Sequence, residues 1–294
     1  MKIAVLTDIH ANFRALETVT DHIERWNPDH VIVAGDIVNR GPRSECCKQK
    51  IEEKHFKDDW KVIRGNHEDY VIERDDPDDP KSGILFDVYQ PVHFAYHQLN
   101  QNISFLRSLP NCINMKIPNL GTIRVCHASM LGNRVGIYPE DKNEKIIKKI
   151  SPPPAVFVAG HTHRSLVHRI NSALIVNAGS VGLPFDGDTR AAYAQITYRK
   201  GQWFAEIIRL KYNLQSAEKD FRDFGFFEGG GPLANIILLE LRSGLGQLYQ
   251  WVSEYYSPIK NGEISVAEAT KKYLKNPVTQ PYWQNMDYLK SKET

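Results

Sequence analysis

The chain has 294 residues, of which 41% are apolar and 24% charged, values typical of a folded globular protein and not of a disordered one. Its net charge is +2, from 37 basic and 35 acidic residues, which gives no support to nucleic acid or a membrane surface as a partner. The apolar run from Ile3 to Leu6 is too short for a signal-peptide core, and no segment approaches a membrane span. We therefore expect a cytoplasmic protein.

The first part of the chain alternates between short apolar runs and amphipathic segments. Asn12 is a good N-cap for the first amphipathic segment, and Asn27-Pro28 ends it. The pattern predicts, in order, strand 3–7, helix 13–26, strand 31–34, helix 44–55 and strand 61–64. Strands that alternate with helices are typical of right-handed crossovers in a parallel sheet. The sequence therefore predicts an α/β fold.

The middle of the chain, from about residue 67 to residue 110, is predicted to hold helices around a polar loop. The acidic, proline-rich run 75–82 lacks the ligand spacing and glycine of a calcium loop, so we interpret it as an exposed loop. After it, a helix is predicted near 140–150 and strands at 112–117, 122–126, 156–160, 167–170, 173–176, 191–197 and 203–210.

Beyond Leu210 the pattern is helical only. Helices are predicted at 215–222, 233–242, 247–256 and 266–274. This region carries no dense cluster of candidate ligands. We expect a catalytic domain of residues 1–210 and a helical C-terminal extension of residues 211–294 packed on it.

The four cysteines show no metal or redox motif. Cys46 and Cys47 are adjacent, Cys112 and Cys126 lie in predicted strands, and no pair has the two-residue spacing of a zinc knuckle. We predict that all four are reduced and structural. Strand alternation would place Cys126 and His127 on opposite faces, which argues against Cys126 as a ligand.

Acidic, amide and imidazole side chains follow five of the predicted strands. Parallel strands deliver the residues that follow them to one edge of the sheet, where ligands bind. Oxygen and imidazole ligands together suit manganese, iron or zinc better than magnesium or calcium. Seven ligands are too many for one ion, so we predict two, about 3.5–4 Å apart, with Asp36 between them. The predicted ligands are Asp8, His10, Asp36, Asn66, His127, His161 and His163.

These motifs, in this order, resemble those of the calcineurin-like metallophosphoesterase superfamily over roughly residues 1–210. The matching segments are D8-x-H10, G35-D36, G65-N66-H67-E68, H127 and G160-H161-T162-H163. The segment 177–182 also resembles bacterial phosphodiesterases and diadenosine-tetraphosphate hydrolases of this superfamily. The resemblance implies a four-layer α/β/β/α sandwich.

The resemblance also implies roles for single residues. One ion would be held by Asp8, His10, Asp36 and His163, and the other by Asp36, Asn66, His127 and His161. His67 would be the catalytic imidazole, able to protonate the leaving oxygen. Two cations would generate a bridging hydroxide that attacks phosphorus, and no covalent intermediate is required. Arg40 and Arg64 flank the central motifs and are candidates for binding the phosphoryl oxygens.

One position departs from a related pattern. The segment 35–41, GDIVNRG, resembles that of Ser/Thr protein phosphatases, but Asn39 stands where those enzymes have the aspartate that partners the catalytic histidine. Glu68 and Asp69 are alternative sources of that carboxylate. The departure argues against protein phosphatase activity.

Three functions follow as hypotheses. The first is a dinuclear phosphoesterase, with manganese as the expected metal and iron or zinc as alternatives, that hydrolyses phosphomonoesters, phosphodiesters or dinucleoside polyphosphates. The second is a protein Ser/Thr phosphatase. The third is a non-catalytic scaffold, which the complete set of ligands argues against. In each catalytic case we expect a small phosphorylated or nucleotide substrate, or a phosphopeptide for the second.

Overall fold

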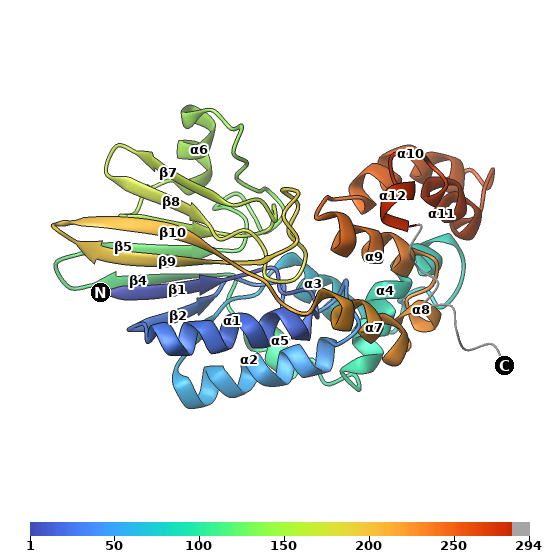
Figure 1. Ribbon diagram of the computed structural model, residues 1–294, viewed down its shortest axis with the longest axis horizontal. Coiled ribbons are helices and arrows are strands. Elements are labelled where there is room, and N and C mark those ends of the chain that lie inside the picture. The colour runs from blue at the N-terminus through green and yellow to red at the C-terminus, as the bar shows by residue number, and fades with distance from the viewer. Residues whose placement is uncertain (284–294) are drawn as a thin grey trace.

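The protein, seen here as a computed structural model that describes residues 1–283, is built from two five-stranded sheets packed face to face. Helices cover the outer face of each sheet, and further helices extend from one end of this sandwich (Figure 1). The predicted α/β sandwich of four layers is confirmed.

The strands of the first sheet come from the beginning and the end of residues 1–210. These strands and the helices that connect them are β1 (Lys2–Leu6), α1 (Phe13–Trp26), β2 (His30–Val33), α2 (Ser44–Asp58), β3 (Lys61–Val62), β9 (Ala191–Arg199) and β10 (Gln202–Leu210). The strand order is β10-β9-β1-β2-β3. As predicted, β1, β2 and β3 run parallel, while β9 pairs antiparallel with β1. The Asn12 side chain accepts a hydrogen bond from the Ala15 N–H and caps α1.

The second sheet comes from the middle of the chain. Its segments are β4 (Cys112–Ile117), β5 (Gly121–Cys126), α6 (Asn143–Ile150), β6 (Val156–Ala159), β7 (Leu166–Ile170) and β8 (Ala173–Asn177). The strand order is β4-β5-β6-β8-β7, with β5, β6 and β8 parallel. Each sheet therefore contains three parallel strands, and the loops after these strands share one end of the sandwich.

The period-two alternation along β1 separates two hydrophobic cores. Ile3 and Val5 pack between the sheets, whereas Ala4 and Leu6 face α1 and α2. A third core lies under α6. Each fully buried aliphatic side chain contributes about 1.5–3 kcal/mol. This double burial makes the strands apolar throughout and holds the loops that follow them in place.

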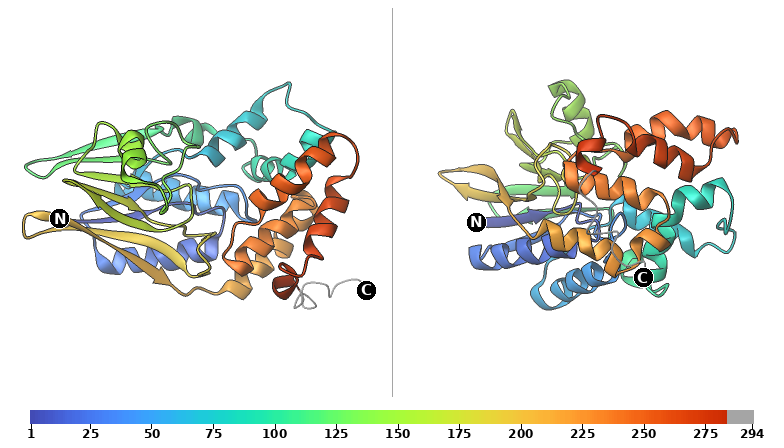
Figure 2. Two further views of the ribbon diagram at one scale, coloured as in Figure 1. Left: turned by 90° about the horizontal axis from the view of Figure 1, so that it is seen from above. Right: turned by 45° about the vertical axis from the view of Figure 1, so that its right-hand side comes forward.

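Apart from α5 (Ser104–Ser108), which packs against the C-terminal turn of α2, the remaining helices gather at the end of the sandwich where the parallel strands finish (Figure 2). They are α3 (Asn66–Ile72), η1 (Glu73–Asp75), α4 (Ile84–Gln98), α7 (Leu214–Asp223), α8 (Phe226–Gly229), α9 (Leu233–Ser243), α10 (Leu248–Lys260), α11 (Val266–Leu274) and α12 (Gln280–Trp283). The C-terminal helices share apolar clusters with Val88 and Phe94 of α4. None of the helices in the described chain is both long and apolar enough to cross a membrane. The division at residue 210 stays a prediction.

The acidic run 75–82 is not fully exposed as predicted. The side chain of Asp79 is buried and pairs with Arg74 at 2.5 Å between Oδ1 and Nη1. His93 of α4 lies 3.5 Å from the other oxygen of Asp79. A buried carboxylate needs an opposite charge nearby. Arg74 of η1 supplies that charge, and Asp79 therefore packs against η1.

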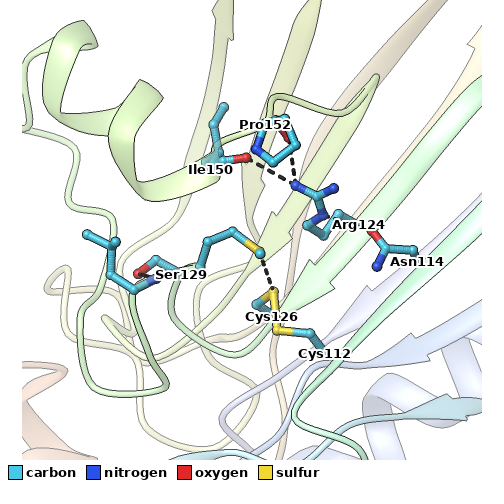
Figure 3. The surroundings of a disulfide bond; sticks show 9 residues. Cys112, Asn114, Arg124, Cys126, Ser129, Ile150 and Pro152 are labelled. Atoms are coloured by element: carbon cyan, nitrogen blue, oxygen red, sulfur yellow. Dashed lines mark hydrogen bonds between the residues drawn. A yellow bond between two sulfur atoms is a disulfide. The ribbon is translucent and has the colours of Figure 1, made fainter.

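The prediction that all four cysteines are reduced is wrong for one pair. Cys112 and Cys126 face each other across the β4–β5 hairpin and form a disulfide (Figure 3). Their Cα atoms are 4.5 Å apart, a separation that permits the bond. The spacing of 14 residues carries no motif, and only the hairpin register brings the two side chains together. Cys46 and Cys47 are free.

The disulfide predicts how many cysteine thiols react with a thiol reagent. Unfolded, unreduced protein should react with a thiol reagent at two sites, Cys46 and Cys47, and at four after reduction. Because the bond closes a loop of 14 residues, its loss should lower the free energy of unfolding by about 3 kcal/mol. Thiol titration and denaturant unfolding with and without reductant measure both quantities. Four reactive thiols before reduction would contradict the pairing.

Candidate metal centre

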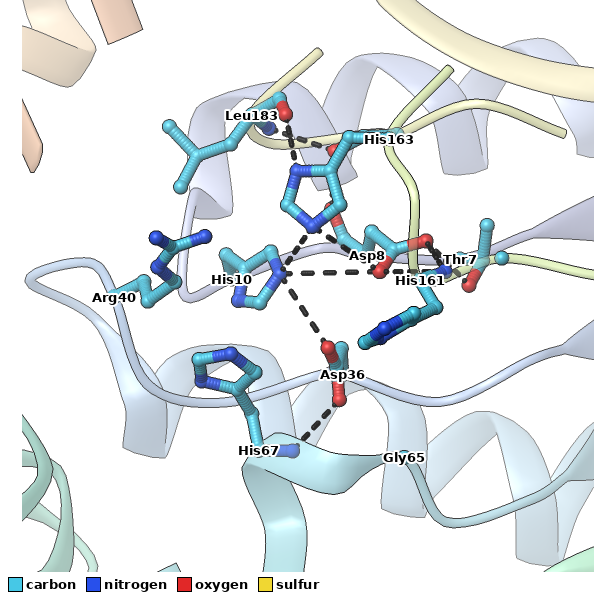
Figure 4. Close-up of polar contacts among 12 residues, drawn as sticks. Thr7, Asp8, His10, Asp36, Arg40, Gly65, His67, His161, His163 and Leu183 are labelled. Carbon is cyan, nitrogen blue, oxygen red and sulfur yellow. Dashed lines mark hydrogen bonds and ion pairs between the residues drawn. The ribbon is translucent and has the colours of Figure 1, made fainter. Parts of the chain in front are cut away.

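The seven predicted ligands meet at one end of the sandwich. The loops after β1, β2 and β3 of the first sheet, and after β5 and β6 of the second, carry them in the order Asp8, His10, Asp36, Asn66, His127, His161 and His163. Most are buried, and several side chains point toward a common centre (Figure 4). Their roles as ligands stay predictions, but the structure places them together.

Four of these side chains form the first ligand group. One donor atom from each lies within 4.8 Å of all the others, and the residues are Asp8, His10, Asp36 and His163. The Nε2 atoms of His10 and His163 are only 3.0 Å apart, and Asp8 Oδ1 lies 3.3 Å from His163 Nε2. Two imidazole nitrogens and two carboxylates that converge in this way match the donor set of a borderline divalent cation.

The second ligand group is centred on Asn66. Its Oδ1 atom lies 3.1 Å from His127 Nε2 and 2.8 Å from His161 Nδ1. This group combines an amide oxygen with two imidazoles from the other sheet. Because Asn66 is the first residue of α3, its position depends on the turn that leads from β3 into that helix.

Asp36 connects the two groups. Its Oδ2 atom is 3.6 Å from His10 Nε2 and 3.2 Å from His127 Nε2. One carboxylate thus faces a ligand of each group, as expected for a residue between two cations. The geometry fits the predicted bridging position.

The backbone around the ligands is strained. Seven site residues have positive φ, a backbone conformation that costs a residue other than glycine roughly 1–2 kcal/mol. They are Asp8, His10, Asp36, Asn39, Arg40, His161 and His163. Glycines allow this crowding: a Cβ on Gly65 would lie 2.2 Å from Asp36 Oδ1, and one on Gly160 2.6 Å from Asp8 Oδ2. The glycines of the motifs are therefore steric requirements of the centre.

Neighbouring groups orient the ligands. The Nδ1 atom of His127 lies 2.7 Å from the carbonyl oxygen of Ala34 and donates to it, which leaves Nε2 facing Asp36. Asp8 Oδ2 accepts hydrogen bonds from the Thr7 hydroxyl and the His161 N–H, each at 2.9 Å. The carboxylates and rings are held in place by the protein itself.

Burial and neighbouring charges set the protonation of these groups. Burial lowers the pKa of His10 well below its usual value, and it lowers the pKa of His161 to about 4. Burial also opposes the charged form of His127, but the Asp36 carboxylate outweighs it and raises the pKa of His127 to about 10. A proton on His127 thus balances the acidic centre, and a metal would have to displace it. The donor set fits divalent cations.

His67 stands beside this centre with Asn39 as its partner. Asn39 Oδ1 accepts a hydrogen bond from the Arg40 N–H at 2.7 Å, so its amide nitrogen faces His67 Nδ1 at 2.9 Å and donates to it. This contact favours the neutral imidazole with its proton on Nε2. Burial, the largest effect, lowers the pKa of His67 to about 3. Neither Glu68 nor Asp69 takes the place of Asn39.

The two arginines lie in different surroundings. Arg40 follows Asn39 in the loop after β2, near His10 and His67 (Figure 4), and its Nη2 atom lies 3.4 Å from Glu240 of α9. Arg64 pairs with Asp69 at 2.9 Å and donates to Asn111. The guanidinium of Arg64 is thus engaged with side chains outside the ligand groups. Binding of substrate by either arginine stays a prediction.

Glu68 has a structural role that the sequence analysis missed. Its buried carboxylate accepts hydrogen bonds from the backbone N–H groups of Gly65 and of 36–38, at 2.7–3.2 Å. Burial is the main reason that its pKa is raised to about 7. Glu68 ties the loop after β2 to the start of α3 and so aligns Asp36 with Asn66. Its place in the 65–68 motif was the only available signal.

The family of the chain follows from comparison with known proteins. The domain of the calcineurin-like phosphoesterase superfamily matches residues 1–201, and the chain belongs to that superfamily. Together with the buried Asp and His cluster, this membership makes it a metal-dependent phosphoesterase, a hydrolase of phosphoric esters.

Individual proteins are similar to this chain in sequence or in fold. The chain is 26% identical over 235 residues to an uncharacterized protein of Methanocaldococcus jannaschii, across 73% of this chain and 89% of that protein. It is also 26% identical to a metallophosphoesterase from Sphaerobacter thermophilus, with a TM-score of 0.63 over 83% of this chain and 99% of that one. A hypothetical protein from Pyrococcus horikoshii OT3, 19% identical, shares the fold with a TM-score of 0.65 over 79% and 97%.

Proposed function

We propose that the protein uses two divalent ions to hydrolyse small phosphomonoesters, phosphodiesters or dinucleoside polyphosphates. The observation that supports two ions is the position of Asp36 Oδ2, near His10 of one ligand group and His127 of the other. When bound, two cations supply a hydroxide nucleophile at neutral pH and neutralise charge on the phosphoryl oxygens.

The side chains around the centre divide the remaining work. Asp8, Asp36 and the imidazoles hold the ions, while His67, which is outside both ligand groups, donates a hydrogen bond from its Nε2–H to the leaving oxygen and stabilises the charge that develops there. We assign to Arg40 the binding of a phosphoryl oxygen, a role supported by the further donors that its pairing with Glu240 at 3.4 Å leaves on the guanidinium. No side chain is required as a nucleophile.

Removal of metal should abolish turnover. We expect purified protein to contain two divalent ions per chain and to lose hydrolysis of bis-p-nitrophenyl phosphate after treatment with a chelator. Re-addition of metal should restore the activity. Elemental analysis and a rate assay measure both results. One ion per chain, or activity unaffected by the chelator, would contradict the two-ion site.

Manganese is the metal that we propose, with iron and zinc as alternatives. The carboxylate, amide and imidazole donors of the two groups support a borderline cation. Separate reconstitution of the stripped protein with each metal, followed by rate measurement, ranks the three. A higher rate with magnesium than with any of them would contradict this choice.

Small esters are favoured over phosphoproteins by one contact. Asn39, and not a carboxylate, faces His67 Nδ1, so the imidazole lacks the charge that favours its acidic form. Protein Ser/Thr phosphatase activity remains the alternative function. A rate on a phosphoserine peptide equal to that on a nucleotide or aryl diester would favour the alternative.

The partner and the location are also proposals. The near-zero net charge supports a small phosphorylated or nucleotide substrate instead of nucleic acid or a membrane. We propose a cytoplasmic location, which cell fractionation followed by detection of the protein tests directly.

A further inference from the structure

A pocket of about 380 Å³ opens directly beside the metal centre. His67, whose ring centroid lies 4.7 Å from that of His10, and Arg40 line the end of the pocket nearest the ligand groups, its inner end. Residues of α3, α4, α9 and α10 line the rest. Its volume lies in the range of small-molecule sites, about 300–1,000 Å³. The C-terminal helices, whose sequence carries no ligand cluster, thus provide a wall next to the candidate catalytic imidazole.

The side walls of this pocket are apolar. Val88 and Val92 project from α4, Leu233 and Ile237 from α9, and Val252 from α10. Such walls favour an uncharged organic group by burial of apolar surface. A phosphoryl group itself would find no charge partner there except at the inner end.

Tyrosine rings line the same pocket. Tyr70 packs edge-on against His67 with ring centroids 5.2 Å apart, and Tyr89 follows at 6.4 Å from Tyr70. Tyr256 of α10, 39% exposed, adds a third ring. Within residues 1–283 the hydroxyls of these three tyrosines make no hydrogen bond. Aromatic side chains favour flat ring systems through stacked and edge-to-face contacts.

Glu240 fixes this wall relative to the metal centre. Its Oε1 atom lies 3.4 Å from Arg40 Nη2 and accepts hydrogen bonds from the backbone N–H groups of Gln247 and Leu248, at 2.9 and 2.8 Å. Glu240 is 1% exposed. The start of α10 is therefore tied to the loop that carries Asn39 and Arg40, so the pocket and the phosphoryl site form one unit.

We propose that this pocket binds a planar aromatic group of the phosphoester substrate, while its phosphoryl group lies at the metal centre. The inference rests on the proposed phosphoesterase function and narrows the substrate to esters with an aryl or heteroaryl group. His67 at the inner end places the ester oxygen between the two sites. The C-terminal helices are thus the part of the chain that selects the substrate.

Two pairs of esters test the proposal, each pair releasing closely matched alcohols. Phenyl and 2-naphthyl phosphate differ by one fused ring, and ribose 5-phosphate and adenosine 5′-monophosphate differ by the base. In the metal-loaded protein, kcat/KM should favour the larger member of at least one pair by about tenfold. Selectivity for the naphthyl ester alone identifies an aryl group, and selectivity for the adenosine ester alone identifies a nucleobase. Equal values within both pairs would overturn the proposal.

Variants of α10 locate the selectivity. Val252→Trp places a large ring in the space proposed for the aromatic group and should reduce the ratio within the selected pair to about one, and Tyr256→Ala should reduce it about threefold. Tyr249→Trp, at a position 85% exposed on the same helix, is the matched control and should preserve the ratio. Thermal unfolding verifies that each variant folds. If Val252→Trp does not fold, the kcat/KM ratio measured for Tyr256→Ala tests the proposal instead. A ratio equal to that of the wild type in either folded variant would overturn the proposal.

Equilibrium binding separates the two possible failures. Calorimetric titration of metal-loaded protein with 2-naphthyl and phenyl phosphate, and with the second pair, reads the pocket without turnover. In one outcome, no ester is hydrolysed, but a larger ligand still binds about tenfold more tightly than its smaller partner and Val252→Trp removes that difference. This outcome would contradict the proposed function and leave the pocket supported. Hydrolysis without any difference in binding or in kcat/KM would overturn the pocket alone.

Discussion

Asp36→Asn should reduce kcat/KM by about 1,000-fold or more and lower the metal content of the purified protein. The amide keeps the shape of the side chain but removes the charge that faces both ligand groups, at 3.6 Å from His10 Nε2 and 3.2 Å from His127 Nε2. Loss of an outer partner of a metal ligand already costs about 10- to 100-fold, and loss of a shared ligand should cost more. Elemental analysis and rate measurement on the same preparation test both effects.

Asp21→Asn is the control for this variant. Asp21 is exposed on α1, belongs to neither ligand group, and undergoes the same change of charge. Its activity and metal content should equal those of the wild type. If Asp36→Asn retained two ions and activity within tenfold of the wild type, the shared position of Asp36 would be refuted.

Asn39→Asp should increase hydrolysis of alkyl phosphate esters by about tenfold and extend their turnover to higher pH. A carboxylate at position 39 would accept a hydrogen bond from Nδ1 of His67, whereas the present amide donates to that atom at 2.9 Å. The change therefore favours the imidazolium, which can protonate a poor leaving group. Aryl esters, whose leaving groups need no proton, should change by less than about twofold.

The direction of the pH effect follows from the protonation of His67. Burial lowers its pKa to about 3, so the imidazolium is lost as pH rises above that value. A raised pKa in Asn39→Asp keeps the acid form available at higher pH, and the alkyl-ester profile should shift upward. Asn119→Asp, in the exposed turn between β4 and β5, makes the same chemical change at a distance and should leave the profile unchanged. A wild-type profile in Asn39→Asp would show that the contact does not govern His67.

Sequence periodicity was sufficient for the parallel strands of the first sheet, whereas the four layers were expected only from the family resemblance. Strands buried on both faces appear as continuous apolar runs, and alternating helices imply parallel order, so β1, β2 and β3 could be predicted from local pattern. The disulfide could not, because the pairing of Cys112 with Cys126 depends on hairpin register. The burial of Asp79 could not be predicted either, because no sequence motif links Asp79 to its ion-pair partner Arg74.

By itself, the sequence determined which residues follow the strands and therefore which side chains reach the shared end of the two sheets. Parallel strands impose that outcome locally, whatever the rest of the chain does. Only the tertiary structure decided that Asn39 is the partner of His67, that Glu68 binds the backbone of the neighbouring loop, and that α9 and α10 wall a pocket beside the centre. These contacts join segments tens to hundreds of residues apart, and their energies depend on distance and direction in space, which residue order does not encode.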